Sequence, residues 1–170
     1  AVARTVASDG QFHYQRTYAH GKKYAPITGY YSYYYGRTML EQTQNPQLTG
    51  TSDAQWLPRL PAPGGGQKPQ GGSLLTTVNA SAQDAAWDGL RGKKGAVVAL
   101  DYSTGAVLAM ASNPSFDPNL LATHDLKASQ QSWKGLLDDP DNPMANRASR
   151  EIYPPGSTFK LVTAAAALQH

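Results

Sequence analysis

A serine and a lysine stand three positions apart near the end of the chain, at Ser157 and Lys160. At the start of a helix this spacing places both side chains on one face. A serine hydroxyl becomes a nucleophile only when a nearby group takes its proton. Lysine can take that proton if burial and the positive end of the helix dipole destabilise its ammonium. The pair therefore indicates nucleophilic serine catalysis.

The residues around this pair matter, because a bare Ser-x-x-Lys pattern also describes a surface serine and lysine on an amphipathic helix. Two prolines and a glycine at 154–156 predict a sharp entry into the helix. The apolar run 161–168 predicts that this helix is buried, and a buried lysine at its first turn is costly unless it has a task. We therefore select Ser157 and Lys160 as the candidate catalytic residues.

Residues 153–160 resemble the active-site motif of the penicillin-binding proteins, which are serine acyltransferases that cross-link bacterial peptidoglycan. Residues 95–119 resemble the first hairpin of the same domain and the loop after it, and residues 146–148 also fit. The stretch from Gly29 to Glu41 is similar to the non-catalytic region of the class B, monofunctional members, above all the actinobacterial A type. The resemblance covers nearly the whole chain.

The resemblance implies a peptidoglycan D,D-transpeptidase. Ser157 would attack the carbonyl of the penultimate D-alanine of a stem peptide and release the last D-alanine, while Lys160 would accept or relay the serine proton. The main-chain N–H of Ser157 would be one oxyanion-hole donor. An amine of a neighbouring peptide would take the acyl group. β-Lactam antibiotics would acylate Ser157 because they mimic the D-alanyl-D-alanine end.

The family uses three motifs, and this sequence contains one of them. No serine is followed two positions later by asparagine, and no lysine is followed by Thr-Gly or Ser-Gly. We therefore expect the front part of such an enzyme, truncated after the Ser-x-x-Lys helix and not active alone. The open alternatives are an inactive fragment that serves as a binding or scaffold piece, a β-lactam sensor domain, and a serine β-lactamase. The polar region and linker ahead of residue 73 fit a β-lactamase poorly.

Composition excludes several other classes of protein. The net charge is +3 and the basic residues are scattered, so no nucleic-acid partner is expected. The chain has no cysteine, and its histidines lack metal-like spacing, so neither a metal nor a cofactor is expected. The longest apolar stretch is too short to cross a bilayer. The resemblance implies a location at the extracytoplasmic face of the membrane, an N-terminal transmembrane anchor outside this chain, and partners among cell-wall synthesis and division proteins.

The resemblance implies an α+β protein, and polarity and turn residues divide the chain into three segments. Residues 1–57 are polar and rich in tyrosine, and would form part of a mixed α/β accessory domain of the dimerisation or pedestal type. Residues 58–72 are almost purely proline, glycine and polar residues, which is typical of a linker or loop. Residues 73–170 would form the N-terminal part of the transpeptidase domain, an antiparallel sheet flanked by helices.

Within the third segment the pattern predicts individual elements. They are a strand at 73–78, a helix at 80–90 capped by Asn79 or Ser81, strands at 95–101 and 106–111, and one or two short helices in 120–137. The turn residues 103–105 predict that the two later strands form a hairpin. The tyrosine cluster at 30–35 predicts an edge that packs through its rings and exposes its hydroxyls to water.

Overall fold

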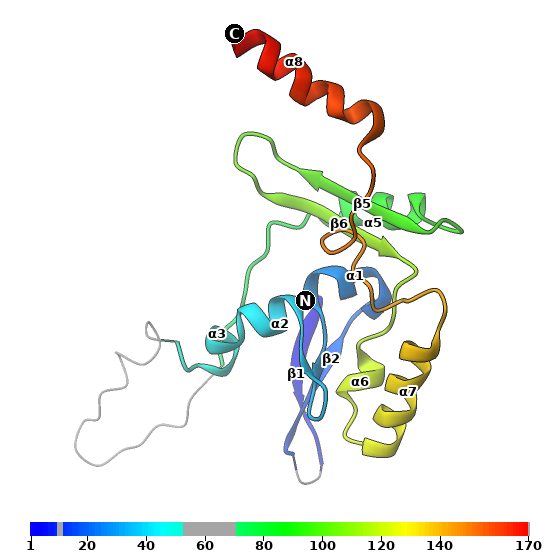
Figure 1. Ribbon diagram of the computed structural model, residues 1–170. Coiled ribbons are helices and arrows are strands. Elements are labelled where there is room, and N and C mark those ends of the chain that lie inside the picture. Colours follow the sequence, from blue (N-terminus) through cyan, green and yellow to red (C-terminus); the bar gives the residue numbers. More distant parts are fainter. Residues whose placement is uncertain (10–11, 53–70, 170) are drawn as a thin grey trace, which may run out of the picture.

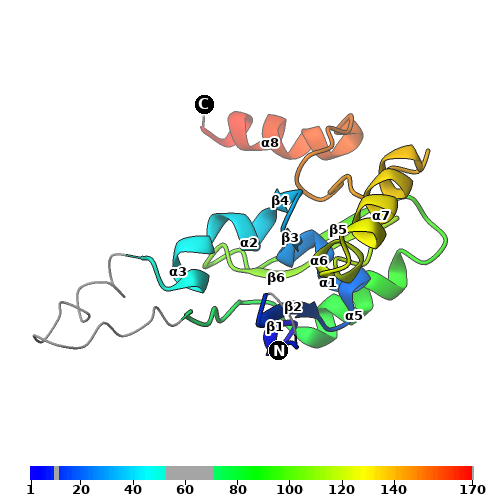
Figure 2. The same cartoon turned by 90° about the horizontal axis from the view of Figure 1, so that it is seen from below.

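The computed structural model describes residues 1–9, 12–52 and 71–169. Within these residues the chain forms three two-stranded antiparallel sheets with helices around them, so the predicted α+β class is confirmed (Figures 1 and 2). The predicted linker lies outside the described residues except for its last two positions. The division at residues 57 and 72 stays a prediction.

The first part of the chain folds into short elements, none of which the sequence pattern had separated. Two are hairpins and three are helices. In chain order they are β1 (Ala3–Ala7), β2 (Tyr14–Tyr18), α1 (Gly21–Thr28), β3 (Tyr31–Ser32), β4 (Gly36–Arg37), α2 (Met39–Thr43) and α3 (Asn45–Thr49). Strand β1 pairs with β2, and β3 pairs with β4.

The second part contains the longer elements. In chain order they are α5 (Ala80–Gly89), β5 (Gly95–Leu100), β6 (Val107–Asn113), α6 (Asn119–Ala122), α7 (Leu126–Asp138), the 3-10 turn η2 (Gly156–Phe159) and α8 (Lys160–Gln169). The predicted helix at 80–90 is confirmed, and the one or two short helices expected in 120–137 are present as two helices, of 4 and 13 residues. Both views place α8, in red, at one end of the molecule (Figures 1 and 2).

The predicted hairpin is confirmed as β5 and β6, with Gly95 opposite Asn113. Its turn is held by the Asp101 carboxylate, which accepts hydrogen bonds from the main-chain N–H and the hydroxyl of Ser103 at 2.8 and 2.6 Å. These bonds lower the pKa of Asp101. Gly105 completes the turn at a φ of 74°, a backbone conformation that favours glycine.

The predicted strand at 73–78 is wrong. Residues 71–79 form no strand: Gly72 and Ser73 bond to Gln47 of α3, and only the end of the stretch reaches β6. Only two hydrogen bonds to β6 are present in this stretch: the Thr77 hydroxyl donates to the Val107 carbonyl at 2.8 Å, and the Asn79 N–H donates to the Leu108 carbonyl at 2.9 Å. A single main-chain bond is too few for a ladder, so this stretch is not a strand.

Helix α5 begins at the cap predicted from the sequence. The Asn79 side chain accepts a hydrogen bond from the Ala82 N–H at 3.0 Å. The apolar face of α5 packs on the β5–β6 hairpin in a small core, which consists of Ala86, Leu90, Ala109 and Ala111. These residues are mostly alanines, so the helix lies close to the sheet.

Gln83 of α5 is fully buried and completes the free edge of β6. Its amide oxygen accepts from the Met110 N–H at 2.8 Å, and its amide nitrogen donates to the Met110 carbonyl at 2.9 Å. The same nitrogen donates to the Lys23 carbonyl of α1 at 2.9 Å. One side chain therefore satisfies three main-chain groups on two elements.

A second core joins the two parts of the chain. It consists of Ala25, Tyr30, Phe116 and Leu121, with Trp133 and Tyr35 packed against it. The Tyr35 and Trp133 rings stack at 4.2 Å between centroids. The packing prediction for the tyrosine cluster holds for Tyr30 and Tyr35, whereas Tyr33 and Tyr34 are 66% and 54% exposed. These two residues lie at the tip of the β3–β4 hairpin, where their rings pack on each other at 5.5 Å between centroids.

A polar network fixes β2 against α2. Glu41, which is nearly buried, accepts hydrogen bonds from the Arg16 guanidinium at 2.6 Å and from the Tyr18 hydroxyl at 3.0 Å. The Tyr18 hydroxyl in turn accepts from the Tyr31 N–H at 2.8 Å. Burial, with the Glu41 charge beside it, raises the pKa of Tyr18 far above its usual range.

Candidate active site

Ser157 lies in the short 3-10 turn η2, and Lys160 is the first residue of α8. The entry to this turn depends on Gly156, whose φ of 53° lies in the left-handed region. The Thr158 N–H donates to the Pro155 carbonyl at 3.1 Å, and the Thr158 hydroxyl donates to the same oxygen. The sharp entry predicted from the two prolines and the glycine is therefore present.

The local backbone brings the two candidate catalytic residues to one side of the chain. A 3-10 turn has three residues per turn, so positions three apart lie one above the other. The Lys160 N–H also donates to the Ser157 carbonyl, which ties the end of the turn to its second residue. Within the described residues the Ser157 hydroxyl and the Lys160 ammonium make no hydrogen bond, and both residues are exposed. Their assignment as nucleophile and base stays a prediction.

The expectation that this helix is buried is wrong for the described residues. Every residue of α8 is exposed, and Leu161, Val162 and Leu168 are 76%, 58% and 90% accessible to solvent. The physical reason is that α8 projects away from both cores, so no described element lies against its apolar side chains (Figure 1). An apolar surface of this kind is typical of a face that another segment covers.

Tyr153 and Glu151 form side-chain contacts in the segment just before the turn. The Tyr153 hydroxyl donates to the Glu151 carboxylate at 2.5 Å. This hydrogen bond raises the pKa of Tyr153 above its ordinary value. Glu151 also forms an ion pair with Arg147, at 3.5 Å between Oε1 and Nε. The segment that leads to Ser157 is therefore linked to the loop before it.

Arg147 is buried in that loop and holds it through hydrogen bonds to main-chain carbonyls. Its side chain is 1% exposed, and its guanidinium donates to the carbonyls of Asp141, Asn142, Pro114 and Ala145 at 2.6 to 3.3 Å. A planar fork of donors suits this use, since one guanidinium can satisfy several carbonyls at once. The Nε atom is buried without a hydrogen bond and has only the longer ion pair to Glu151. The sequence drew attention to residues 146–148 only through the family resemblance.

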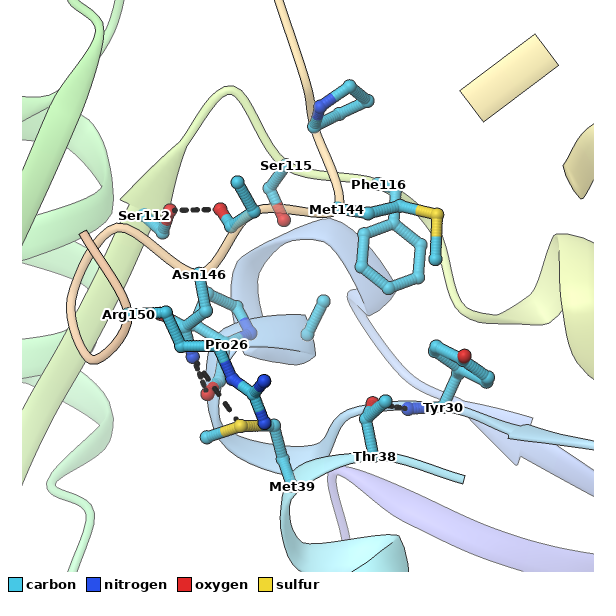
Figure 3. A pocket seen from close by; sticks show the side chains of 13 residues that line it. Pro26, Tyr30, Thr38, Met39, Ser112, Ser115, Phe116, Met144, Asn146 and Arg150 are labelled. Carbon is cyan, nitrogen blue, oxygen red and sulfur yellow. Dashed lines mark hydrogen bonds between the residues drawn. The ribbon is translucent and has the colours of Figure 1, made fainter. Parts of the chain in front are cut away.

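The neighbouring residue, Asn146, reaches the other part of the chain. Its amide nitrogen donates to the Pro26 carbonyl of α1 at 2.8 Å, and its amide oxygen accepts from the Ala148 N–H at 3.2 Å. A cavity of about 150 Å³ lies beside this contact, between α1 and the loop (Figure 3). Tyr30, Met39, Phe116 and Met144 line it together with polar residues, among them Asn146 and Arg150. Neither Ser157 nor Lys160 lines the cavity.

Two further searches concern the described residues alone. In residues 1–9, 12–52 and 71–169, no three histidine, cysteine or acidic side chains gather where they could hold a metal ion. In the same residues no helix is both long and apolar enough to cross a bilayer.

Comparison with protein families divides the chain into two matched regions. Residues 1–74 match the penicillin-binding protein A dimerisation domain, and residues 95–170 match the penicillin-binding protein transpeptidase domain. The second region contains both candidate catalytic residues.

Comparison with individual proteins gives similarity over almost all of the chain. It is 48% identical to the peptidoglycan D,D-transpeptidase PbpA of Mycolicibacterium smegmatis and 46% identical to that of Mycobacterium tuberculosis, over 99% and 98% of this chain. The structure of penicillin-binding protein A from M. tuberculosis as a penicillin G acyl-enzyme complex superposes with a TM-score of 0.90 and 47% identity, over 99% of this chain and 40% of that one. The chain spans 35% of the length of both curated relatives.

Proposed function

Since this chain belongs to the class B penicillin-binding proteins, we propose that it acts, within the protein that carries it, as part of a peptidoglycan D,D-transpeptidase. Ser157 is the proposed nucleophile and Lys160 the group that accepts or relays its proton. The observation that carries this proposal is the placement of Ser157 and Lys160 on one side of a glycine-initiated turn, inside the region that matches the transpeptidase domain.

The reaction follows from serine acyl-transfer chemistry. The Ser157 hydroxyl attacks the carbonyl of the penultimate D-alanine, its proton passes to Lys160, and the terminal D-alanine leaves with its amine protonated. The amine of a neighbouring stem peptide then takes the acyl group and regenerates the serine. The Ser157 N–H, in the turn η2 that leads into α8, is the proposed donor to the oxyanion that forms in each step. We place the reaction at the extracytoplasmic face of the membrane, where its peptidoglycan substrate lies.

β-Lactam antibiotics are proposed as covalent ligands of the same serine. The M. tuberculosis relative was solved as acyl-enzyme complexes with penicillin G and imipenem, which supports the proposal by similarity. Cell-wall synthesis and division proteins are proposed partners.

Covalent labelling tests the nucleophile. The protein encoded by the complete gene should gain the mass of one benzylpenicillin per chain, and Ser157→Ala should gain none while its thermal unfolding stays unchanged. Lys160→Ala should take the label at a rate lower by roughly 100-fold or more, the range for one general base. Ser149→Ala, an exposed serine in the preceding loop, is the matched control. Labelling of Ser157→Ala at the wild-type rate would refute the assignment.

A further inference from the structure

Helix α1 contains a proline, and this has a direct effect on its hydrogen bonds. Pro26 has no N–H, so the Lys22 carbonyl four residues earlier lacks its partner within the helix. The Ser115 hydroxyl, from the loop after β6, donates to that carbonyl at 2.7 Å. The proline therefore leaves an acceptor on the helix that the other part of the chain occupies.

The Pro26 carbonyl is a second such acceptor. Helix α1 ends at Thr28, and the Tyr30 N–H, which would continue the ladder, donates instead to the Thr38 hydroxyl at 3.3 Å. Carbonyls in the last turn of a helix need partners from outside it. Asn146 supplies this one at 2.8 Å, in a buried contact (Figure 3).

Three carbonyls of α1 thus accept hydrogen bonds from the second part of the chain, and we call them the α1 acceptor row. The row consists of the carbonyls of Lys22, Lys23 and Pro26, and their donors are Ser115, Gln83 and Asn146. Of these donors only Asn146 stands on the segment that leads to Ser157. Its neighbour Arg147 fixes the loop around it, through the carbonyl contacts described above and through its own N–H, which donates to the Ser112 hydroxyl at 3.1 Å.

We propose that Asn146 is a positioning residue for Ser157, which holds the segment ahead of the nucleophile in register with helix α1 of the dimerisation-type region. Residues 151–155, between this loop and the turn, are all exposed. Asn146 and Arg147 are the last buried side chains before Ser157. The contacts of Asn146 and Arg147 therefore set the orientation of the turn. A shift of α1 would change that orientation through Asn146. The inference rests on the proposed function of Ser157.

Two variants of Asn146 test the proposal in the protein encoded by the complete gene. Asn146→Asp keeps the size of the side chain and its acceptor for the Ala148 N–H, but removes the donor to Pro26. Asn146→Ala removes both bonds without adding charge, and serves if the aspartate variant does not fold. Ser115→Ala is the matched control, because it removes another bond to the α1 acceptor row from a loop that does not lead directly to Ser157.

The first readout is acylation by a fluorescent penicillin, separated into the rate constant at saturating penicillin and the final label per chain. The rate constant should fall roughly 10- to 100-fold in Asn146→Asp, the range expected when a nucleophile is displaced by about an ångström. The final label should stay at one per chain. The rate constant of Ser115→Ala should stay within about twofold of the wild-type value, which corresponds to a change in activation free energy of less than about 0.5 kcal/mol. A lower final label with an unchanged rate constant would show only a folding role and overturn the proposal.

The second readout does not depend on the reaction. Hydrogen exchange of the amides at 156–160 should become faster in Asn146→Asp and stay unchanged in Ser115→Ala. Unchanged exchange together with an unchanged acylation rate would overturn the proposal. In one outcome, the wild-type protein takes no label while hydrogen exchange at 156–160 still becomes faster in Asn146→Asp alone. That result would refute the proposed function but support the role of Asn146 in holding the turn in place.

Discussion

Replacement of Gln83 by alanine should be among the most destabilising single changes in this chain. Gln83 is 0% exposed and makes three hydrogen bonds, two to Met110 and one to the Lys23 carbonyl. The two bonds to carbonyls contribute about 1 kcal/mol net each, and the buried donor left unpaired, the Met110 N–H, costs about 1–3 kcal/mol. We therefore expect Gln83→Ala to lower the free energy of unfolding by about 3–5 kcal/mol.

Urea denaturation of the complete protein measures the loss, and exchange of the Met110 amide locates it. Local opening that is easier by about 3 kcal/mol should speed this exchange roughly 100-fold or more. Gln131→Ala, at an exposed glutamine of α7, should change stability by no more than about 0.5 kcal/mol. A loss below about 1 kcal/mol in Gln83→Ala would refute the reasoning, because it would mean that the three main-chain groups do not depend on this amide.

Two further changes test the capping and charge arguments. Asn79→Ala removes the cap of α5 and should cost about 1 kcal/mol in urea denaturation, and an unchanged midpoint would show that the Ala82 N–H is satisfied otherwise. The pKa of Tyr18 is raised in the folded protein, so the unfolded chain releases this proton first as the pH rises. The contribution of Tyr18 to stability is therefore complete below about pH 10, the usual tyrosine pKa, and is lost as the pH rises above that value. Tyr18→Phe should therefore lose stability less steeply than wild type above pH 10, and identical slopes in denaturation at pH 9 to 11 would contradict this.

Local chemistry made part of this structure predictable from the sequence. Asn79 caps its helix through its own side chain, and Gly105 and Gly156 stand where the backbone takes a positive φ. Signals of this kind act within a few residues, so the hairpin, the helix α5 and the turn at Ser157 follow from them. The candidate catalytic pair was selected on the same basis.

The features that the sequence pattern did not give depend on distant contacts. Gln83 is an ordinary polar residue of an amphipathic helix until β6 presents an unpaired N–H and carbonyl to it. Pro26 would normally end a helix, and it is retained because Ser115, far away in sequence, supplies the missing donor. The apolar composition of α8 led to the wrong prediction that it is buried. Composition shows that a helix has apolar side chains to bury, but not which segment of the protein covers them.

The two edges of the β5–β6 hairpin differ in how many of their main-chain groups are already bonded, and this decides on which side a further strand can be added. The β6 edge is closed by Asn79 and Gln83, which occupy the groups that an added strand would need. In the described residues the outer edge of β5 has no such cover, and its Val98 and Leu100 side chains are 43% and 59% exposed. An unpaired edge is a template for a further strand. Any strand that joins this sheet, from the same polypeptide or from a second copy, must therefore dock beside β5, so the sheet can be extended from one side only.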